Sequence, residues 1–276
     1  MLFFIVLFIT ILSFAADALS QHIPFSVEHR LVRKVHIDTQ SVTTGPAPQY
    51  LQHLADDLSK NMQLPEDMKI TVSIVNSNVV NAFATLGGNV VFFTGLLEKL
   101  PNENTLAMVL AHEIAHIKLR HPLRALGRGV VVGLAIATVA GASANGVVDS
   151  LIGNTGLLTA LSFTRDQESA ADNLAVDALV KLYGHAGGST ELFAILSKEE
   201  DQASGLSKAK TPEFFATHPL GKNRIAAIIN QAQKNHWPMT GNMQDIPRPV
   251  SAEIRRLHNS LQTSKPKKKT TKKPNI

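Results

Sequence analysis

The chain has 276 residues, of which 44% are hydrophobic and 18% are charged, so it is long enough to bury the core of one large domain. It contains no cysteine, which excludes disulfides, thiolate metal ligands and a lipid-modified N-terminal cysteine. The formal net charge is +5, and the lysine-rich segment 263–276 accounts for it, so the rest of the chain is close to neutral. No aromatic residue lies among these lysines, and we expect no nucleic-acid binding.

The chain begins with an uncharged, largely apolar segment from Leu2 to Ala16, followed by Ala16-Asp17-Ala18. A membrane span needs about 20 residues, so this segment matches a signal peptide better, and Ala-x-Ala is a pattern that signal peptidase accepts. We expect residues 1–18 to be a signal peptide that directs the chain to the periplasm. The alternative is a retained anchor, because no Lys or Arg precedes the apolar segment.

The next elements combine a helix, a few strands and a long helical region. Apolar residues recur at helical spacing in residues 47–62, whereas segments 68–75 and 80–97 are rich in β-branched and aromatic residues. Residues 102–234 favour helices, interrupted by a polar linker at 199–211. The pattern predicts an α+β fold, mainly helical, with a small antiparallel sheet.

The stretch "TLAMVLAHEIAHIKL" contains His112, Glu113 and His116 in an otherwise almost wholly apolar run. Burying such groups without partners costs several kcal/mol each. Residues four apart lie on one face of a helix, so the two histidines can bind one metal ion while Glu113 projects beside it. A solvated helix face is the alternative, but it would require polar neighbours. The spacing therefore indicates one zinc ion per chain with a nearby general base.

A catalytic zinc takes three protein ligands and leaves one position open, so a third ligand is needed. The best candidate follows a predicted capping box at Thr164 and Gln167, in a helix that Gly184 ends. Glu168 lies on the stripe of small and apolar residues along that helix, formed by Ala171, Ala175, Ala178 and Leu182. A carboxylate on a buried face needs a cation, and we expect Glu168 to bind the zinc.

Asp172 lies one turn after Glu168 on nearly the same face. It can accept a hydrogen bond from the second ring nitrogen of a ligating histidine, which fixes the tautomer of that histidine. Spacing alone does not exclude other carboxylates, such as Asp177, as the third ligand.

Residues 129–148 form a run of twenty residues without a charge. The run is long enough to span a bilayer, but Gly, Ala and Ser dominate it, which weakens its preference for lipid. We expect a buried or membrane-apposed helical hairpin between the two zinc-binding helices, with membrane insertion as the alternative.

The motifs "AHEIAH", "ESAAD", "NAFAT" and "THPLGKNRI" together resemble those of the CAAX-prenyl-protease/HtpX/BepA-like zinc metallopeptidases. The similarity covers about residues 45–235, and the chain resembles a short exported bacterial member. The resemblance implies a gluzincin-type core with His112, His116 and Glu168 on zinc, Glu113 as general base and Asp172 behind a ligand. The tetratricopeptide array of BepA-like members and the multiple spans of HtpX-like members have no counterpart in this sequence.

The segment Ala82-Phe83-Ala84-Thr85 has two interpretations. As a central strand it belongs to the core. As an edge strand it could hold a substrate peptide in extended form, and the family resemblance favours this role.

The motif "THPLGKNRI" supplies His218 and Arg224 as candidate donors to the oxyanion of the tetrahedral intermediate. His218 could instead occupy the fourth zinc position when substrate is absent. In a purely structural role, His218 would stabilise a turn and Arg224 would pair with a core acid.

Together these features predict a zinc metalloendopeptidase, residues 19–240, that cleaves misfolded or unassembled envelope proteins. A chaperone-like exported protein with weak or latent proteolysis is the alternative, and a structural zinc protein is a third reading that would not need Glu113. Residues 241–262 form a C-terminal extension. The disordered basic tail 263–276 is a candidate contact for an anionic membrane surface.

Overall fold

The computed structural model of the chain describes residues 10–12, 14–15, 18–20, 22–32, 41–140, 163–204, 218 and 223–263. Within these ranges the side chains of residues 134, 136–140, 198–204 and 262–263 are not described. Much of the predicted signal peptide, the second half of the run 129–148, most of "THPLGKNRI" and almost all of the basic tail therefore lie outside the described residues.

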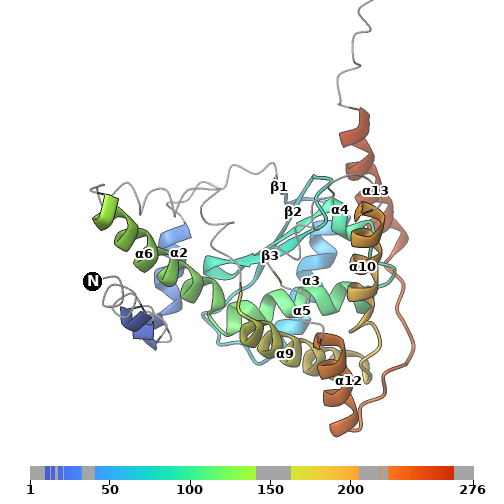
Figure 1. Ribbon diagram of the computed structural model, residues 1–276. Helices are drawn as coiled ribbons and strands as arrows, with labels where there is room; N and C mark the ends of the chain where they lie inside the picture. Colours follow the sequence, from blue (N-terminus) through green and yellow to red (C-terminus); the bar gives the residue numbers. More distant parts are fainter. Residues whose placement is uncertain are drawn as a thin grey trace, which may run out of the picture.

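The described elements confirm a mainly helical α+β fold (Figure 1). The helices are α2 (Phe25–Val32), α3 (Pro46–Asn61), α4 (Thr94–Leu97), α5 (Glu103–Lys118), α6 (His121–Ala140), α9 (Arg165–Tyr183), α10 (Glu191–Ser204), α12 (Arg224–Lys234) and α13 (Arg248–Thr263). The strands are β1 (Ser41–Val42), β2 (Thr71–Val75), β3 (Ala82–Thr85) and β4 (Asn89–Phe93), and a 3₁₀ turn, η1 (Leu86–Gly88), joins β3 to β4. Helix α10 continues to Ser204, so the linker expected from residue 199 begins later than predicted.

The four strands form one sheet in the order β1-β2-β4-β3. The expectation of an antiparallel sheet is wrong for its central pair, because β2 and β4 are parallel, while β1–β2 and β3–β4 are antiparallel. Consecutive strands β2 and β3 do not pair, since β4 lies between them. Residues Val90, Val91 and Phe92 are all buried, and an unbroken apolar run suits a central strand that is covered on both faces.

Strand β3 is an edge of the sheet as far as the described strands go, because it pairs with β4 alone. The Phe93 N–H donates to the Asn81 carbonyl at 3.1 Å. Hydrogen-bonded pairs alternate along an antiparallel ladder, so the backbone N–H and C=O groups of Ala82 and Ala84 point away from β4. Among the described strands these groups have no partner, and both residues are 0% exposed.

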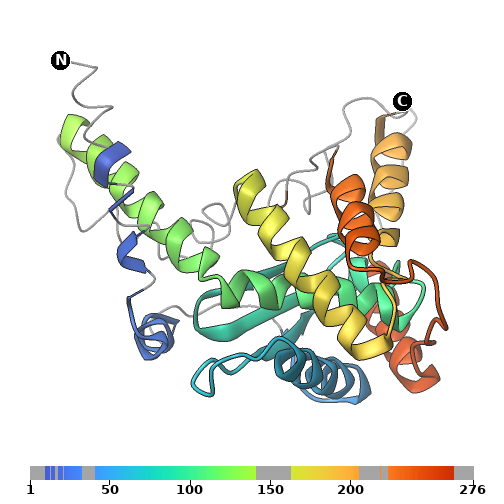
Figure 2. The same cartoon turned by 90° about the horizontal axis from the view of Figure 1, so that it is seen from below.

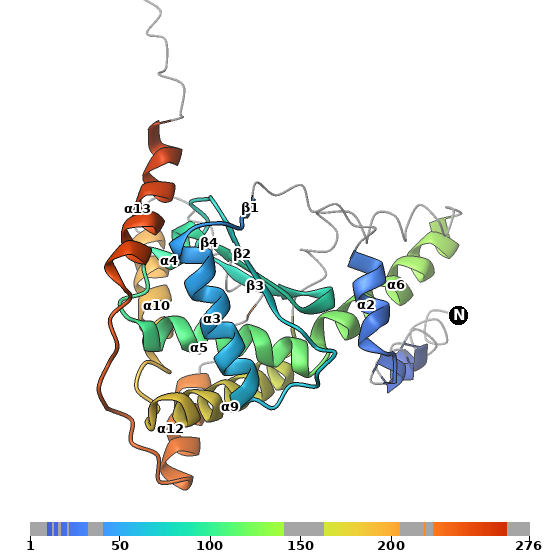
Figure 3. The same cartoon turned by 180° about the vertical axis from the view of Figure 1, so that it is seen from behind.

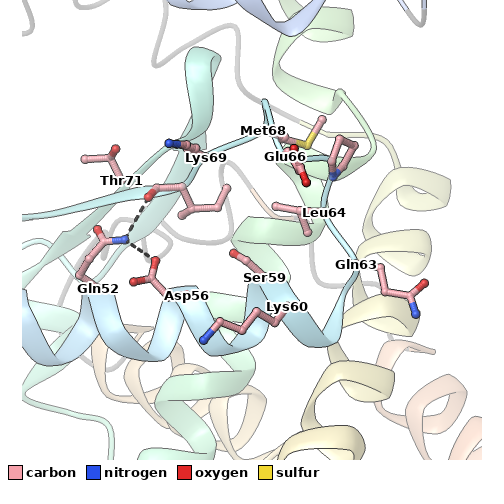
Figure 4. A pocket seen from close by; sticks show the side chains of 12 residues that line it. Gln52, Asp56, Ser59, Lys60, Gln63, Leu64, Glu66, Met68, Lys69 and Thr71 are labelled. Carbon is pink, nitrogen blue, oxygen red and sulfur yellow. Dashed lines mark hydrogen bonds between the residues drawn. The ribbon is translucent and has the colours of Figure 1, made fainter.

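At the opposite edge of the sheet, a side chain occupies the backbone groups of the strand. Next to the short β1, the Gln52 side chain of α3 accepts a hydrogen bond from the Val72 N–H at 2.9 Å. It also donates to the Ile70 carbonyl at 3.0 Å (Figure 4). Gln52 also lines a pocket of about 930 Å³ between α3 and the segment leading to β2. A side-chain amide thus occupies backbone groups that could otherwise pair with another strand.

The two faces of the sheet carry different apolar clusters. Helices α3 and α5 cover one face, where alternate strand residues join the main core: Val72, Ile74, Ala82, Ala84, Val90 and Phe92. On the other face, Phe83 and Val91 pack with Ala125 of α6 and with Phe163, which precedes α9. The second cluster connects the edge strand to the start of α6.

Helices α5 and α9 lie side by side beneath the sheet (Figures 1 and 2). Ala111 and Ala115 of α5 and Ala171, Ala175 and Ala178 of α9 are all fully buried. Small side chains allow two helix backbones to approach closely. This helix pair forms the centre of the molecule.

Helix α6 extends away from the helix pair, toward the side of the molecule where α2 lies (Figures 1 and 3). The expected helix in the run 129–148 is present as far as Ala140, but residues 129–133 are half-buried or exposed, with Val132 43% exposed. The buried form of the expected hairpin is therefore wrong for these residues. Among the described helices, none combines the length and hydropathy required to cross a membrane.

Helix α13, in the C-terminal part of the chain, lies against α3 and α4 (Figure 3). Val250 and Ile254 are buried, and the Glu253 carboxylate accepts a hydrogen bond from the Ala47 N–H at 2.7 Å. Glu253 therefore caps the N-terminus of α3, where anionic groups are favoured. The apolar spacing at Val250, Ile254 and Leu257 could have predicted this helix from the sequence.

Candidate metal centre

The HExxH segment lies in the middle of α5, a helix that is buried on every side. Asn102 caps the helix by accepting a hydrogen bond from a backbone N–H of the first turn at 2.8 Å. All residues from Asn104 to Ile117 are buried, as expected for a helix that is apolar all round. His112, Glu113 and His116 are only 3%, 0% and 0% exposed.

Helix α9 brings the carboxylates. The capping box at Thr164 and Gln167 and the left-handed C-cap at Gly184 are both present, so the predicted bounds of this helix are confirmed. Glu168 and Asp172 lie on the face toward α5 and are 0% and 3% exposed.

Four residues converge beside the two helices. His112, His116, Glu168 and His218 each offer a ligand atom, and these atoms all lie within 4.8 Å of one another. The Nε2 atoms of His112 and His116 are 3.0 Å apart, and each is 3.5 Å from a Glu168 carboxylate oxygen. His218 Nδ1 lies 3.3 Å from His112 Nε2 and 3.1 Å from Glu168 Oε1. We call these four residues the zinc cluster.

Each helix-borne histidine uses its other ring nitrogen for a second partner. His112 Nδ1 lies 3.0 Å from Asp172 Oδ1. His116 Nδ1 lies 2.9 Å from Nδ1 of His121, a residue that begins α6 and is 2% exposed. The ring of Phe163 stacks on His116 with centroids 4.0 Å apart. These contacts, on the side of each ring that faces away from the zinc cluster, therefore hold the orientation of both imidazoles.

Arg224, at the start of α12, faces the carboxylates of α9. Its Nε and Nη2 donate to the two oxygens of Asp172, both at 2.7 Å, and Nη1 lies 2.6 Å from Glu168 Oε2. These contacts agree with pairing to core acids, the second of the two roles that the sequence left open for Arg224.

Burial and these neighbours determine the charge states of the site. Burial alone would raise the pKa of Glu168, but the facing His218 and His112 hold that pKa well below its usual range. Burial opposes the ionised form of Asp172 too, yet hydrogen bonds from His112 and Arg224 lower its pKa. Both carboxyl groups are therefore ionised.

The pKa values of the histidines differ from one another. Burial alone would lower the pKa of His112, but hydrogen bonds to Asp172 and Glu168 raise it to about 9. Burial, followed by the neighbouring His112, holds the pKa of His116 well below its usual value. Burial, followed by the Arg124 charge, lowers the pKa of His121 to about 3, so this imidazole is neutral.

Glu113 lies beside the zinc cluster. Neither of its carboxylate oxygens makes a hydrogen bond within the described residues, although both are buried. His218 Nε2 lies 3.4 Å from Glu113 Oε1. A buried carboxylate in this state is costly unless positive charge or a reacting group lies nearby.

The donor set fits a zinc ion. Two ring nitrogens and a carboxylate oxygen converge in a space from which solvent is excluded, and a cation at that point would offset the charge of Glu168 and the unbonded oxygens of Glu113. Imidazole and carboxylate ligands without sulfur are typical of catalytic zinc sites. His218 lies at the centre as a fourth group, which is one of the positions that the sequence left open for it.

The structure brings together His112, Glu113, His116, Glu168 and His218, with Asp172 behind His112. Asp177, which spacing had left open as a ligand, pairs instead with Lys181 at 2.7 Å. Sequence reasoning missed His121 and Phe163. The position of His121, five residues after His116 and next to the end of the apolar run, was the available signal.

The fold and the zinc cluster define the chain as a zinc metallopeptidase of the HExxH class. Residues 47–232 match peptidase family M48, and the chain belongs to that family. This confirms the family resemblance and the zinc cofactor.

Three relatives illustrate the range of the family. The beta-barrel assembly-enhancing protease of Yersinia pestis is 34% identical over 185 residues, which cover 62% of this chain and 36% of that protein. The mitochondrial metalloendopeptidase OMA1 of Schizosaccharomyces pombe is 30% identical over 196 residues, or 65% of this chain and 55% of that protein. The metalloprotease LoiP of Escherichia coli is 28% identical over 183 residues, or 64% of this chain and 68% of that protein. The chain thus spans 36% of the length of the first of these relatives.

Proposed function

We propose that this chain is a zinc-dependent endopeptidase that hydrolyses peptide bonds of misfolded or unassembled envelope proteins. The observation that carries the proposal is the buried Glu113 carboxylate, which lies beside the zinc cluster without a hydrogen bond among the described residues. A structural zinc site needs no such group. The names of the relatives, which are proteases and metalloendopeptidases, support the same reaction.

Glu113 is the proposed general base and acid. When bound, zinc supplies a Lewis acid that polarises the scissile carbonyl and lowers the pKa of water to about 7. The Glu113 carboxylate takes a proton from the attacking water and delivers it to the leaving amine. Its burial supports this role, because a carboxylate shielded from solvent is available to the reacting groups alone.

Asp172 and Arg224 are proposed as orienting residues. His112 Nδ1 lies 3.0 Å from Asp172 Oδ1, and with zinc bound this carboxylate would keep the remaining ring proton on Nδ1 and leave Nε2 for the metal. Arg224 holds Asp172 and Glu168 in place with three nitrogen atoms. We therefore do not assign Arg224 to the oxyanion.

His218 has two proposed states. Its Nδ1 lies among the ligand atoms, so in the resting enzyme His218 would be a fourth ligand to the zinc and would exclude water from it. When substrate enters, the imidazole moves aside and can donate to the oxyanion of the tetrahedral intermediate. The resting enzyme is then self-inhibited.

The edge strand β3 is the proposed substrate-binding element. The outward backbone groups of Ala82 and Ala84 can pair with an extended peptide by strand addition. The side-chain oxygens of Asn81 and Thr85, at the two ends of β3, are buried without a hydrogen bond in the described part of the chain. Phe83 belongs to the apolar cluster that also contains Phe163, the ring stacked on His116, so β3 is connected to the zinc cluster.

The alternative function is a chaperone-like protein that holds unfolded chains with little turnover. His218 lies in the zinc cluster, where it would keep the resting protein inactive, and this position supports the alternative of little turnover. The test is cleavage of casein and of a denatured protein by the purified full chain, with and without a chelator. Cleavage that the chelator inhibits and that Glu113→Gln abolishes supports the peptidase. If both the original chain and His218→Ala bind the denatured protein without cleaving it, the result supports the chaperone.

Export to the periplasm, with peripheral membrane attachment through the basic tail, is proposed from residues 1–18 and 263–276. Intact mass and fractionation test this part. A mature chain that begins at Leu19 in the soluble or peripheral fraction supports a cleaved signal peptide. An intact chain that resists carbonate extraction supports a retained anchor.

A further inference from the structure

His121 stands in an unusual turn between the HExxH helix and α6. Arg120, the last residue before α6, has a φ of 59°, a left-handed conformation that is unfavourable for a non-glycine residue. The Arg120 side chain holds the turn, because its Nε donates to Glu28 Oε1 at 2.7 Å and its Nη2 donates to the Ile23 carbonyl at 2.9 Å. The turn directs His121 back toward the preceding helix.

The result is a direct contact between two imidazoles in a dry environment. His121 Nδ1 and His116 Nδ1 are 2.9 Å apart, and the two residues are 2% and 0% exposed. The Phe163 ring lies beside both, with centroids 4.0 Å from His116 and 5.9 Å from His121. At this distance one nitrogen must donate a proton and the other must accept it.

The zinc ligand decides the direction of this hydrogen bond. His116 presents Nε2 to the zinc cluster, and that nitrogen must be unprotonated to bind a metal. A neutral imidazole then carries its proton on Nδ1 and can only donate there. His121 must accept through an unprotonated Nδ1 and carry its own proton on Nε2.

We propose that His121 is a positioning residue that holds His116 in the Nδ1–H tautomer and fixes the direction of its zinc-binding nitrogen. It performs for His116 what Asp172 performs for His112, but as a neutral acceptor. The site already contains Glu113, Glu168 and Asp172, so an uncharged partner orients the second imidazole without adding a fourth negative charge to a buried region.

Zinc affinity of the purified full chain tests the proposal, and it does so independently of peptide hydrolysis. In His121→Leu no acceptor remains, and zinc affinity measured by chelator competition falls roughly 10- to 100-fold, the usual cost of losing a partner behind a ligand. In His121→Asn the side-chain oxygen branches from Cγ as Nδ1 does, and affinity stays within about threefold of the original.

His185 provides a matched control. It is also buried, at 6% exposed, and bonds to Gly187 and Asn242 with no contact to the zinc cluster. His185→Leu lowers thermal stability and leaves zinc affinity unchanged. Affinity in His121→Leu equal to that of the original chain, or an equal loss in the Leu and Asn variants, would show that His121 only packs.

A measurement on the unaltered chain remains available if His121→Leu does not fold. In the zinc-loaded protein with ¹⁵N-labelled histidine, we expect a proton on His116 Nδ1 and a scalar coupling across the hydrogen bond to His121 Nδ1. A proton on Nδ1 of His121, or a protonated His116 Nδ1 without coupling to His121, would overturn the proposal. Neither result depends on whether the chain cleaves peptides.

Discussion

The zinc cluster is assembled from two kinds of support. His112 and His116 belong to α5, and Glu168 belongs to α9. The two helices pack side by side through buried alanines, and each has a capped N-terminus. His218 reaches the same point from a bend and is not part of a described helix. The helix-borne ligands are fixed by helix packing and by partners behind them, whereas His218 belongs to a segment outside the described helices. This difference suits three permanent ligands and one that substrate can replace.

Removing a helix-borne ligand should have the largest effect. We expect His112→Ala, His116→Ala and Glu168→Ala to lose zinc and all peptide cleavage, because His218, which exchanges on substrate binding, cannot replace a permanent third ligand beside the two remaining helix ligands. Elemental analysis after gel filtration measures this. Asp177→Ala on the outer side of α9 is the control and should retain one zinc per chain. A full complement of zinc in Glu168→Ala would refute the assignment of the third ligand.

Glu113→Gln comes next and separates chemistry from metal binding. The variant should retain its zinc, because Glu113 is not a ligand, while turnover falls about 10²- to 10⁴-fold with the loss of the general base. Zinc content and cleavage of a denatured protein are measured on the same sample. Cleavage at the original rate would remove Glu113 from the mechanism.

His218→Ala tests whether His218 is a ligand that substrate can replace. The variant should keep its zinc on the three helix-borne ligands and change turnover by roughly an order of magnitude or more. The position of Nδ1 among the ligand atoms predicts an increase, and a decrease would mean that oxyanion stabilisation dominates. His53→Ala, at an exposed position of α3, is the control. An unchanged rate would return His218 to the role of a turn residue.

The smallest effect is expected at the edge strand. Ala84→Pro removes one outward backbone N–H of β3 and leaves the bonds to β4 in place, since proline is tolerated at sheet edges. Losing one net hydrogen bond of about 1 kcal/mol should raise KM roughly fivefold with little change in zinc content. Phe83→Pro, which removes a bond to β4, should lower the thermal stability instead. Equal KM values in Ala84→Pro and the original chain would argue against strand addition.

The helix-borne half of the site could be predicted from the sequence because its signals are local. The spacing of His112 and His116, the capping box at Thr164 and the alanine stripe before and after Asp172 all follow from helical periodicity. These patterns assign each residue to one face of its helix, and two buried helix faces can pack together in only a few ways. The sequence alone therefore assigns these residues of α5 and α9 to one centre.

The remaining features depend on long-range pairing that no local pattern encodes. The parallel pairing of β2 with β4 arises because residues 76–81 carry the chain past the position that β4 later fills. The capping of α3 by Glu253 joins residues 206 positions apart in the sequence. His121 was missed because the left-handed turn at Arg120, which brings it back to His116, contradicts the local preference of arginine.

X-ray absorption at the zinc edge tests the two kinds of support most directly, because it counts the imidazoles around the metal. The account predicts three imidazoles and one carboxylate in the resting full chain, and two imidazoles in His218→Ala with the metal retained. Two imidazoles in both proteins would place His218 outside the zinc coordination and contradict the distinction between permanent and exchangeable ligands.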